Sequence, residues 1–261
     1  MRPTHSNPFR ILVACLLATC LFALAPSGTA QDIGQLRKTF EELDAKKDEA
    51  GLREYWKQNA DVALYVIDSY LEGSLKLIET KGDAQKIGAM QQLALRGAHA
   101  ADAALGREIF ADYASAFVGW DEAQRKSFRA GQKAHGKARG ALEKDAAAAL
   151  KSAEECVALA RPLGDWWGTA MGLTAAAEAQ EKLGKAEAAA DLHAQAWLIH
   201  SELGLRGDAY GNLTAMARLH AELGRNDRAR VSAQRALEMA RALGDAEGTL
   251  KLEELVKRLT R

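Results

Sequence analysis

The chain has 261 residues, and its 35 basic side chains balance 35 acidic ones. Loss of Arg2 and Arg10 with a cleaved leader would leave 33 basic residues against 35 acidic ones, a net charge of −2. This balance excludes the strongly basic surface typical of nucleic-acid-binding proteins. Cys15 and Cys20 would leave with the same leader, so a mature chain would keep only Cys156 and could form no internal disulfide.

Residues 1–30 have the pattern of a secretory signal peptide. An uncharged apolar run at 11–25 follows a basic start, and small residues lead up to Ala30. We expect cleavage after Ala30, export to the periplasm or the medium, and no stable membrane span in the mature chain. Two alternatives stay open: a membrane anchor formed by an uncleaved signal, and a lipid anchor on Cys15 or Cys20.

Residues 31–81 are expected to form an N-terminal segment of two or three helices. An apolar stripe at helical spacing marks the first helix, at Leu36, Phe40 and Leu43. A second helix is predicted from about Leu52 toward Glu79. It is apolar on so many sides that neighbouring helices should cover more than one face. Gly82 and Asp83 are expected to end it.

Residues 82–164 are expected to form degenerate helix pairs. Three glycines interrupt residues 121–140, at Gly131, Gly136 and Gly140. Each glycine costs about 1 kcal/mol inside a helix, so we expect a frayed helix or a hinge in this stretch. The run from Ala141 to Leu163 favours a strong helix.

The clearest pattern lies in residues 165–244. The dipeptide Leu-Gly recurs every twenty residues, at 163–164, 183–184, 203–204, 223–224 and 243–244. Each interval holds one run rich in good helix formers and ends at a glycine that can take the left-handed conformation of a helix end. Residues 165–204 match residues 205–244 at ten positions without a gap, so the repeating unit is a pair of helices.

Small residues recur at fixed places in the second helix of each pair. They stand at Ala189 and Ala196, again at Ala229 and Ala236, and, forty residues before the first pair, at Ala149 and Cys156. We expect these positions to be buried at helix crossings. Residues 245–261 complete the chain with a charged capping helix. The fold class predicted is therefore all-α, an α-solenoid of antiparallel helix pairs.

These positions resemble the tetratricopeptide repeat (TPR) family, in a form of roughly forty residues. A large residue, a small one, a turn glycine and two further small ones follow the family spacing, at Leu173, Ala177, Gly184, Ala189 and Ala196, and at Leu213, Ala217, Gly224, Ala229 and Ala236. The chain departs from the pattern where the family has aromatic residues, at Gln180, His220, His193 and Ala233. It also lacks the proline that often closes a repeat.

The resemblance implies a TPR-like superhelix whose inner wall binds an extended peptide or another protein. The family positions of that wall fall on Met171, Thr174, Glu178, Gly211, Thr214, Arg218, Lys251, Glu254 and Arg258. The wall is mixed in charge. Lys/Asn pairs clamp a terminal carboxylate in some members of the family, but Thr174, Glu178, Ala215 and Leu255 stand at four of the five clamp positions. A clamp for a terminal carboxylate is therefore disfavoured.

The sequence contains little that indicates catalysis. Phosphate loops, CxxC, HExxH and a nucleophile elbow are missing from it. His193 and His200 are two helical turns apart, roughly 10 Å, too far for one metal ion. His220 could return near His193, and Cys156 could be a nucleophile, although its alanine-like position suggests a dry site. Trp166 and Trp167 could stack a ligand or fill a seam between repeats.

We therefore expect an exported scaffold or adaptor that is not an enzyme, needs no cofactor or metal, and binds another protein through its concave face. The first alternative is a sensor domain that holds a small ligand. The second is a metal or thiol enzyme that uses His193, His220 or Cys156.

Overall fold

The computed structural model describes residues 33–260, and this part of the chain contains α-helices and one short 3-10 turn but no strand. The helices are α1 (Ile33–Ala45), α2 (Glu49–Gln58), α3 (Ala63–Glu79), α4 (Ala84–Leu105), α5 (Ile109–Gly119), α6 (Glu122–Ala141), α7 (Ala146–Ala160), η1 (Arg161–Leu163), α8 (Trp166–Lys182), α9 (Ala186–Glu202), α10 (Arg206–Glu222), α11 (Asn226–Leu243) and α12 (Ala246–Leu259).

The signal peptide predicted at residues 1–30, with its cleavage after Ala30, lies outside the described residues. Among the helices of residues 33–260, none combines the length and the apolar character that a membrane crossing requires.

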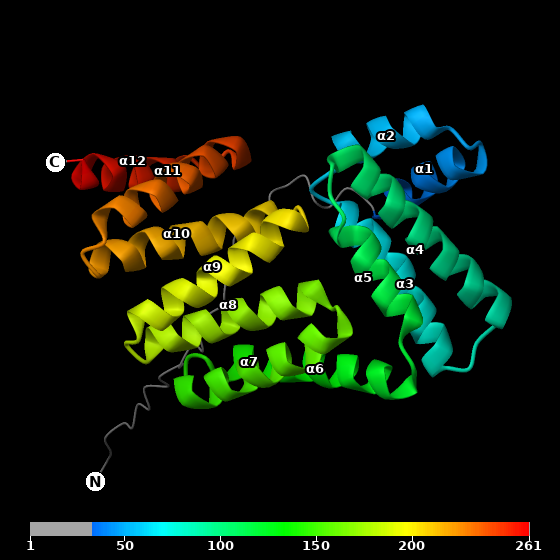
Figure 1. Ribbon diagram of the computed structural model, residues 1–261, viewed down its shortest axis with the longest axis horizontal. Helices are drawn as coiled ribbons and strands as arrows, with labels where there is room; N and C mark the ends of the chain where they lie inside the picture. Colours follow the sequence, from blue (N-terminus) through cyan, green and yellow to red (C-terminus); the bar gives the residue numbers. More distant parts are fainter. Residues whose placement is uncertain (1–32, 261) are drawn as a thin grey trace, which may run out of the picture.

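The second half of the chain is a continuous helical array. From α6 to α12 each helix packs on the next one along the chain, and successive helices are joined by short turns and run in opposite directions (Figure 1). The prediction of an all-α solenoid built from antiparallel helix pairs is confirmed.

The glycines of the Leu-Gly dipeptides end the helices as predicted. All five have left-handed backbone, with φ between 68° and 74°, at Gly164, Gly184, Gly204, Gly224 and Gly244. A side chain in this conformation meets its own backbone at a cost of roughly 1–2 kcal/mol, which glycine avoids. The turns between helices therefore have one shape, and this is why the helices follow one another at equal intervals.

The small residues of the repeat lie where the helices are closest. Each predicted alanine has no exposed surface, at Ala149, Ala189, Ala196, Ala229 and Ala236, and Cys156 is 1% exposed. The prediction that these positions are buried is confirmed. A larger side chain at any of them would have to push two packed helices apart.

The first half of the chain is a bundle made of α1 to α5, with aromatic residues at its centre. The rings of Phe40 and Trp56 lie 5.5 Å apart, and the Tyr55 hydroxyl donates a hydrogen bond of 3.0 Å to the carbonyl of Leu36. Helices α4 and α5 pack with α2 and α3 in this bundle, so they belong with the N-terminal segment in space.

The single helix predicted from Leu52 toward Glu79 is wrong, because the chain breaks between α2 and α3. The Asn59 side chain donates to the carbonyl of Tyr55 at 2.8 Å, and the backbone N–H of Asn59 bonds to the same carbonyl. Asparagine competes in this way with the helical hydrogen bonds of its own segment. Residues 59–62 form a turn, and the N–H of Val62 bonds to the carbonyl of Asn59 at 3.1 Å.

The end of α3 also differs from the prediction in detail. Lys81, rather than Gly82, has the left-handed backbone, with φ 53°. The N–H of Gly82 bonds back to the carbonyl of Leu77 at 2.7 Å. Asp83 then caps α4, because its side chain accepts hydrogen bonds from Gln85 and Lys86.

The frayed helix or hinge predicted at residues 121–140 is wrong. This stretch forms one helix of 20 residues, α6. Asp121 and Gln124 begin it with a capping box, in which each side chain bonds the backbone N–H of the other residue. Ala134 and Ala138 are buried on one face against the array. The burial of that face and the cap offset the cost of the three glycines.

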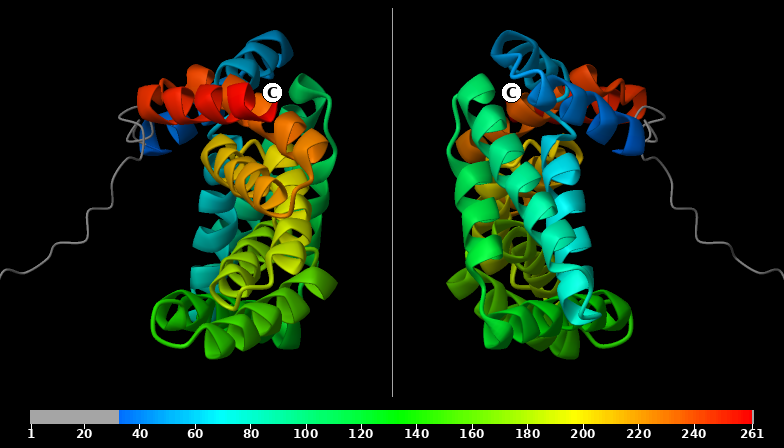
Figure 2. Two further views of the ribbon diagram at one scale, coloured as in Figure 1. Left: turned by 90° about the vertical axis from the view of Figure 1, so that its left-hand side faces the viewer. Right: turned by 90° about the vertical axis from the view of Figure 1, so that its right-hand side faces the viewer.

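The turn between α9 and α10 makes one of the contacts between the bundle and the array. Gly204 lies so close to the bundle that a Cβ atom built on it would be 2.7 Å from the carbonyl oxygen of Ala60. On either side, Arg107 donates to the carbonyl of Glu202 at 2.8 Å, and Arg206 pairs with Asp61 at 3.1 Å. Figure 2 shows the molecule from its two ends, with the array in front of the bundle in the left view and the bundle in front in the right view.

Candidate functional site

A groove lies between α10 and α12 at the end of the array. It has a volume of about 890 Å³. Tyr210, Thr214 and Arg218 line it from α10, where their four-residue spacing places them on one face of the helix. Four residues of α12 form much of the opposite wall, at Lys251, Leu252, Leu255 and Arg258.

Local capping interactions fix the shape of the groove. Asp245 begins α12 by accepting a hydrogen bond of 2.9 Å from the N–H of Gly248. Its second oxygen accepts a hydrogen bond of 2.8 Å from the Tyr210 hydroxyl. Burial and the neighbouring Asp245 carboxylate raise the pKa of Tyr210 to about 12, so this tyrosine keeps its proton and ties α10 to the start of α12.

The basic residues of the groove differ in what they contact. Arg218 pairs with Glu222 at 3.0 Å and also with Glu181 of α8. Lys251 pairs with Glu247 at 2.6 Å. The side chain of Arg258 makes no ion pair or hydrogen bond with any of residues 33–260. It is therefore the groove cation whose charge the described chain does not already engage.

The structure brings together four of the residues predicted for the inner wall: Thr214, Arg218, Lys251 and Arg258. Gly211 and Glu254 are exposed but do not line the groove. The remaining three lie elsewhere. Glu178 pairs with Arg139, Thr174 bonds to Asn212, and Met171 lines a separate cavity. The charge of Glu178 is thus engaged by a residue of another helix, and the charge of Arg218 is engaged in part in the same way.

A buried polar chain runs behind Arg218 and crosses three helices. Glu181 bonds to Nε2 of His193 at 2.8 Å, and Nδ1 of His193 lies 2.7 Å from Oδ1 of Asn212. The amide nitrogen of Asn212 lies 3.0 Å from Nδ1 of His200. Sequence reasoning missed Glu181 and Asn212, because neither belongs to a repeated position and their partners lie in other helices.

These contacts bear on the alternative of a metal enzyme. Both ring nitrogens of His193 are already held by Glu181 and Asn212, so none is left for a metal shared with His220. Residues 33–260 contain no group of three or more His, Cys, Asp or Glu side chains arranged to hold a metal ion.

Cys156 has the surroundings of a packed residue. Its sulfur lies 3.5 Å from the carbonyl oxygen of Gly168, to which the thiol can donate. Burial, together with the charge of Asp165, raises the pKa of the Cys156 thiol to about 11. A thiol in this state is a poor nucleophile near neutral pH, because the thiolate is the reactive form.

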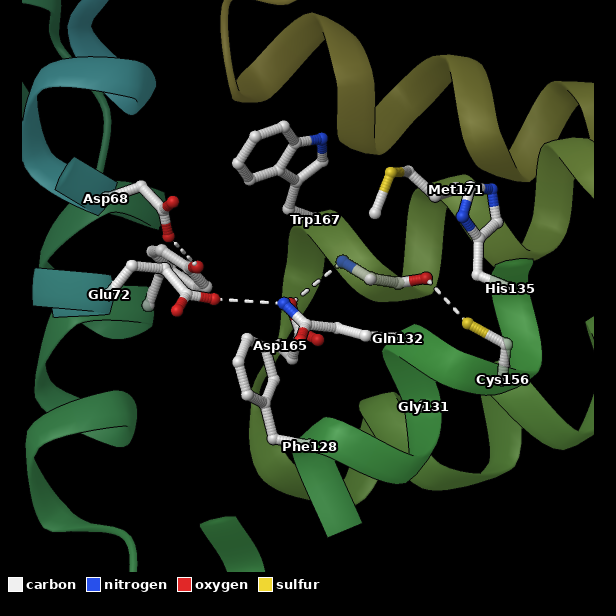
Figure 3. Close-up of a pocket in the computed structure, with 12 residues that line it drawn as sticks. Asp68, Glu72, Phe128, Gly131, Gln132, His135, Cys156, Asp165, Trp167 and Met171 are labelled. Carbon is white, nitrogen blue, oxygen red and sulfur yellow. Dashed lines mark hydrogen bonds between the residues drawn. The ribbon is translucent and has the colours of Figure 1, made fainter. Parts of the chain in front are cut away.

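A second, smaller cavity of about 210 Å³ lies where the bundle meets the array. Figure 3 shows Asp68 and Glu72 of α3 on one side of it, with Trp167 and Met171 of α8 across from them. Trp166 and Trp167 both pack against the core of the bundle, so they fill the seam, and Trp167 also lines the cavity. Sequence reasoning did not identify Asp68 and Asp165 as cavity residues.

No protein-family model matches the chain, and the search of curated proteins also found no match. The function is therefore inferred from the residues of the groove and of the cavity.

Proposed function

We propose that the chain is an exported, non-catalytic scaffold that binds an extended segment of another protein in the groove between α10 and α12. The observation that carries the proposal is Arg258. This cation lies at the edge of a groove with an apolar floor, and no described residue neutralises it. The occupant that fits is an extended peptide with a carboxylate side chain for Arg258 and an apolar side chain a few residues away.

The lining of the groove supports an occupant of this kind. Leu252 is buried in the floor, and Leu255 and Leu259 are partly exposed beside it. A peptide side chain laid on these residues would remove apolar surface from water, which is worth about 25 cal/mol for each Å² covered. Arg258 and Lys251 would then orient the peptide and speed its approach through their charge.

The test uses short random peptides displayed on phage and selected on the whole protein. We expect the enriched peptides to share an Asp or Glu near an apolar residue. Arg258→Glu should weaken their binding at least tenfold, about 1.4 kcal/mol, as measured by calorimetry.

Lys257→Glu is the matched control, because Lys257 is exposed in the same last turn of α12 but does not line the groove. Both changes place an acid at the C-terminus of a helix and carry the same penalty for stability. Equal losses in the two variants, or full binding to Arg258→Glu, would show that the partner docks elsewhere. A selection that enriches no peptide would also count against the proposal.

A further inference from the structure

The smaller cavity is enclosed by elements from both halves of the molecule. Asp68 and Glu72 come from α3 and Tyr113 from α5, while α6, α7 and α8 supply the opposite wall. Its volume of about 210 Å³ corresponds to about seven water-sized groups, at about 30 Å³ each. This space suits a small organic molecule or the end of one long side chain.

Aromatic rings and a thioether make up the apolar part of the wall. They belong to Tyr113, Phe128, Trp167 and Met171. Trp167 is held by Tyr65, whose ring packs edge-on against it with the centroids 5.5 Å apart. This contact helps to orient the indole in the absence of a ligand. Aromatic faces attract organic cations through the negative charge of their π-systems.

Two carboxyl groups of the cavity have an oxygen without a partner in the described chain. Asp165 is 5% exposed, and its Oδ1 accepts a hydrogen bond of 2.8 Å from the N–H of Gly168. Oδ1 of Asp68 accepts a hydrogen bond of 2.7 Å from the Tyr113 hydroxyl. The Oδ2 atoms of both residues accept none from residues 33–260.

Asp245 is a cap of the same kind whose second oxygen has a donor within the described chain, whereas the caps at Asp48, Asp121 and Asp145 are exposed and leave their second oxygen open to solvent. Asp165 and Asp245 both begin a helix and both bond to the N–H of a glycine three residues later. At Asp245 the second oxygen accepts the Tyr210 hydroxyl. The corresponding oxygen of Asp165 has no such donor. The missing donor at Asp165, inside a cavity, points to a ligand that supplies one.

The described chain also lacks a cation for these carboxyl groups. The guanidinium of Arg129, whose charge acts on Asp68, is held by Glu72 at 2.9 Å and by Glu79 at 2.7 Å. Neither Asp68 nor Asp165 forms an ion pair within residues 33–260. A buried carboxylate without a cation is costly, so such a site favours a ligand with positive charge.

We infer that this cavity binds a small organic ammonium ion, with the ammonium group between Asp68 and Asp165 and its carbon chain or ring against Trp167. The ion can be a free amine or the end of a lysine side chain, since both present the same group. This inference is independent of the groove at α10 and α12, because the two sites share no residue.

The charges around the cavity set the expected pH dependence. Burial raises the pKa of Asp68 to about 7 and that of Asp165 to about 6, and the carboxylate of Glu72 adds to both shifts. Burial also lowers the pKa of His135 and keeps the protons on Tyr113 and Cys156. The charge of Arg129 lowers the pKa of Asp68, but it offsets only part of the rise caused by burial.

An ammonium ion binds the ionised carboxylates, so its affinity should rise between about pH 5 and about pH 8. The complex should release protons as it forms near pH 6. Burial and the charge of Arg139 lower the pKa of His135, so its imidazole carries less competing positive charge than an exposed histidine would.

The test is a calorimetric titration of the whole protein at about pH 8 with benzylammonium and, separately, with Nα-acetyl-lysine amide. Benzyl alcohol serves as the neutral analogue. We expect saturable binding of at least one ammonium compound and at least tenfold weaker binding of the alcohol. Preference for benzylammonium would assign a free amine, and preference for the lysine derivative would assign a side chain. Binding of neither, or equal binding of the alcohol, would overturn the inference.

Variants locate the site. Asp165→Asn keeps a good helix cap, and Asp68→Asn keeps an acceptor for Tyr113, so each removes the charge with little other change. Both should weaken ammonium binding at least tenfold, whereas Asp83→Asn, the same change at the cap of α4, should leave it unaltered. Unchanged affinity in the Asp68 and Asp165 variants would overturn the assignment. If either variant fails to fold, the wild-type protein alone still tests the assignment. An affinity for the ammonium compound that stays constant from pH 5 to pH 8 would contradict it.

Discussion

Burial in the folded protein disfavours the charged form of Asp68. The contribution of Asp68 to the stability of the folded state should therefore depend on pH. Burial, with the nearby carboxylates, raises its pKa from 3.8 to about 7. Below about pH 4 the folded and unfolded chains both hold the proton. Between about pH 4 and pH 7 only the unfolded chain loses it, so the stability of the folded state falls as pH rises through this window.

Asp68→Asn cannot titrate, so the variant should gain stability relative to the wild type as pH rises from about 4 to about 7, and the difference should then level off. Urea unfolding of both proteins across this range measures the effect. A difference that stays constant with pH would mean that folding does not shift the pKa of Asp68.

Cys156 is the second residue whose state follows from burial. It is 1% exposed, and its pKa is raised to about 11. A thiol reagent at about pH 8 should therefore label it slowly in the native protein and rapidly in urea. Cys156→Ala should fold as the wild type does and should bind peptides in the groove between α10 and α12 equally well, because Cys156 does not line that groove. Rapid labelling of the native protein would restore Cys156 as a candidate nucleophile.

Single residues were predictable where the sequence repeats. Ala189 and Ala229 occupy equivalent places in successive helix pairs, so their common smallness marked them as buried. Asp68 and Asp165 have no such counterpart, because the cavity joins helices from the two halves of the chain. Arg258 was predicted to lie on the inner wall, but its lack of an internal partner depends on contacts that only the structure reveals.

At the scale of the helix, two glycines should respond in opposite ways to the same substitution. Gly136 is exposed on α6, and a Cβ built there meets nothing within 4 Å. Gly136→Ala should therefore stabilise the protein by about 0.5–1 kcal/mol, because alanine loses less backbone freedom on folding.

Gly172 lies where α8 crosses α7, and a Cβ built there would be 2.8 Å from Cγ2 of Val157. Gly172→Ala should destabilise the protein, since overpacking of a crossing costs about 1–3 kcal/mol and outweighs the gain in propensity. Thermal melting of both variants checks the pair. If both alanines raised the melting temperature, α7 and α8 would have to be farther apart than described.

Sequence reasoning described two stretches of helix wrongly, one because of a distant interaction and one because of a local one. Glycine content predicted a hinge in α6, but burial of Ala134 and Ala138 in the array prevails. The apolar run from Leu52 toward Glu79 predicted one helix, yet Asn59 breaks it with its own side chain. Propensity contains no term for burial against distant helices, and the low propensity of the single residue Asn59 was outweighed by the good helix formers around it.

For the molecule as a whole, the contact between the bundle and the Gly204 turn can be tested with two equivalent glycines. Gly204 and Gly184 have φ of 74° and 73°, so the free-energy cost of placing alanine in left-handed backbone is the same at both positions. Only at Gly204 would the added Cβ meet another segment, 2.7 Å from the Ala60 carbonyl oxygen.

We expect Gly204→Ala to lose about 1–3 kcal/mol more unfolding free energy than Gly184→Ala, by urea denaturation, because it also strains this contact. Equal losses in the two variants would show that the bundle does not rest on the turn. The repeat predicted the array because every unit carries the same pattern. The docking of the bundle involves Ala60 and Gly204 once only, so no periodic signal could reveal it.

That docking also imposes an order of events on the chain as it is made. Leu163, Leu203 and Leu205 belong to the same apolar core as the bundle. A ribosome adds about 5–20 residues each second, so the interval between Ala60 and Gly204 takes on the order of ten seconds. During that time this part of the bundle's core has no cover, so the unfinished chain exposes apolar surface until the turn between α9 and α10 emerges.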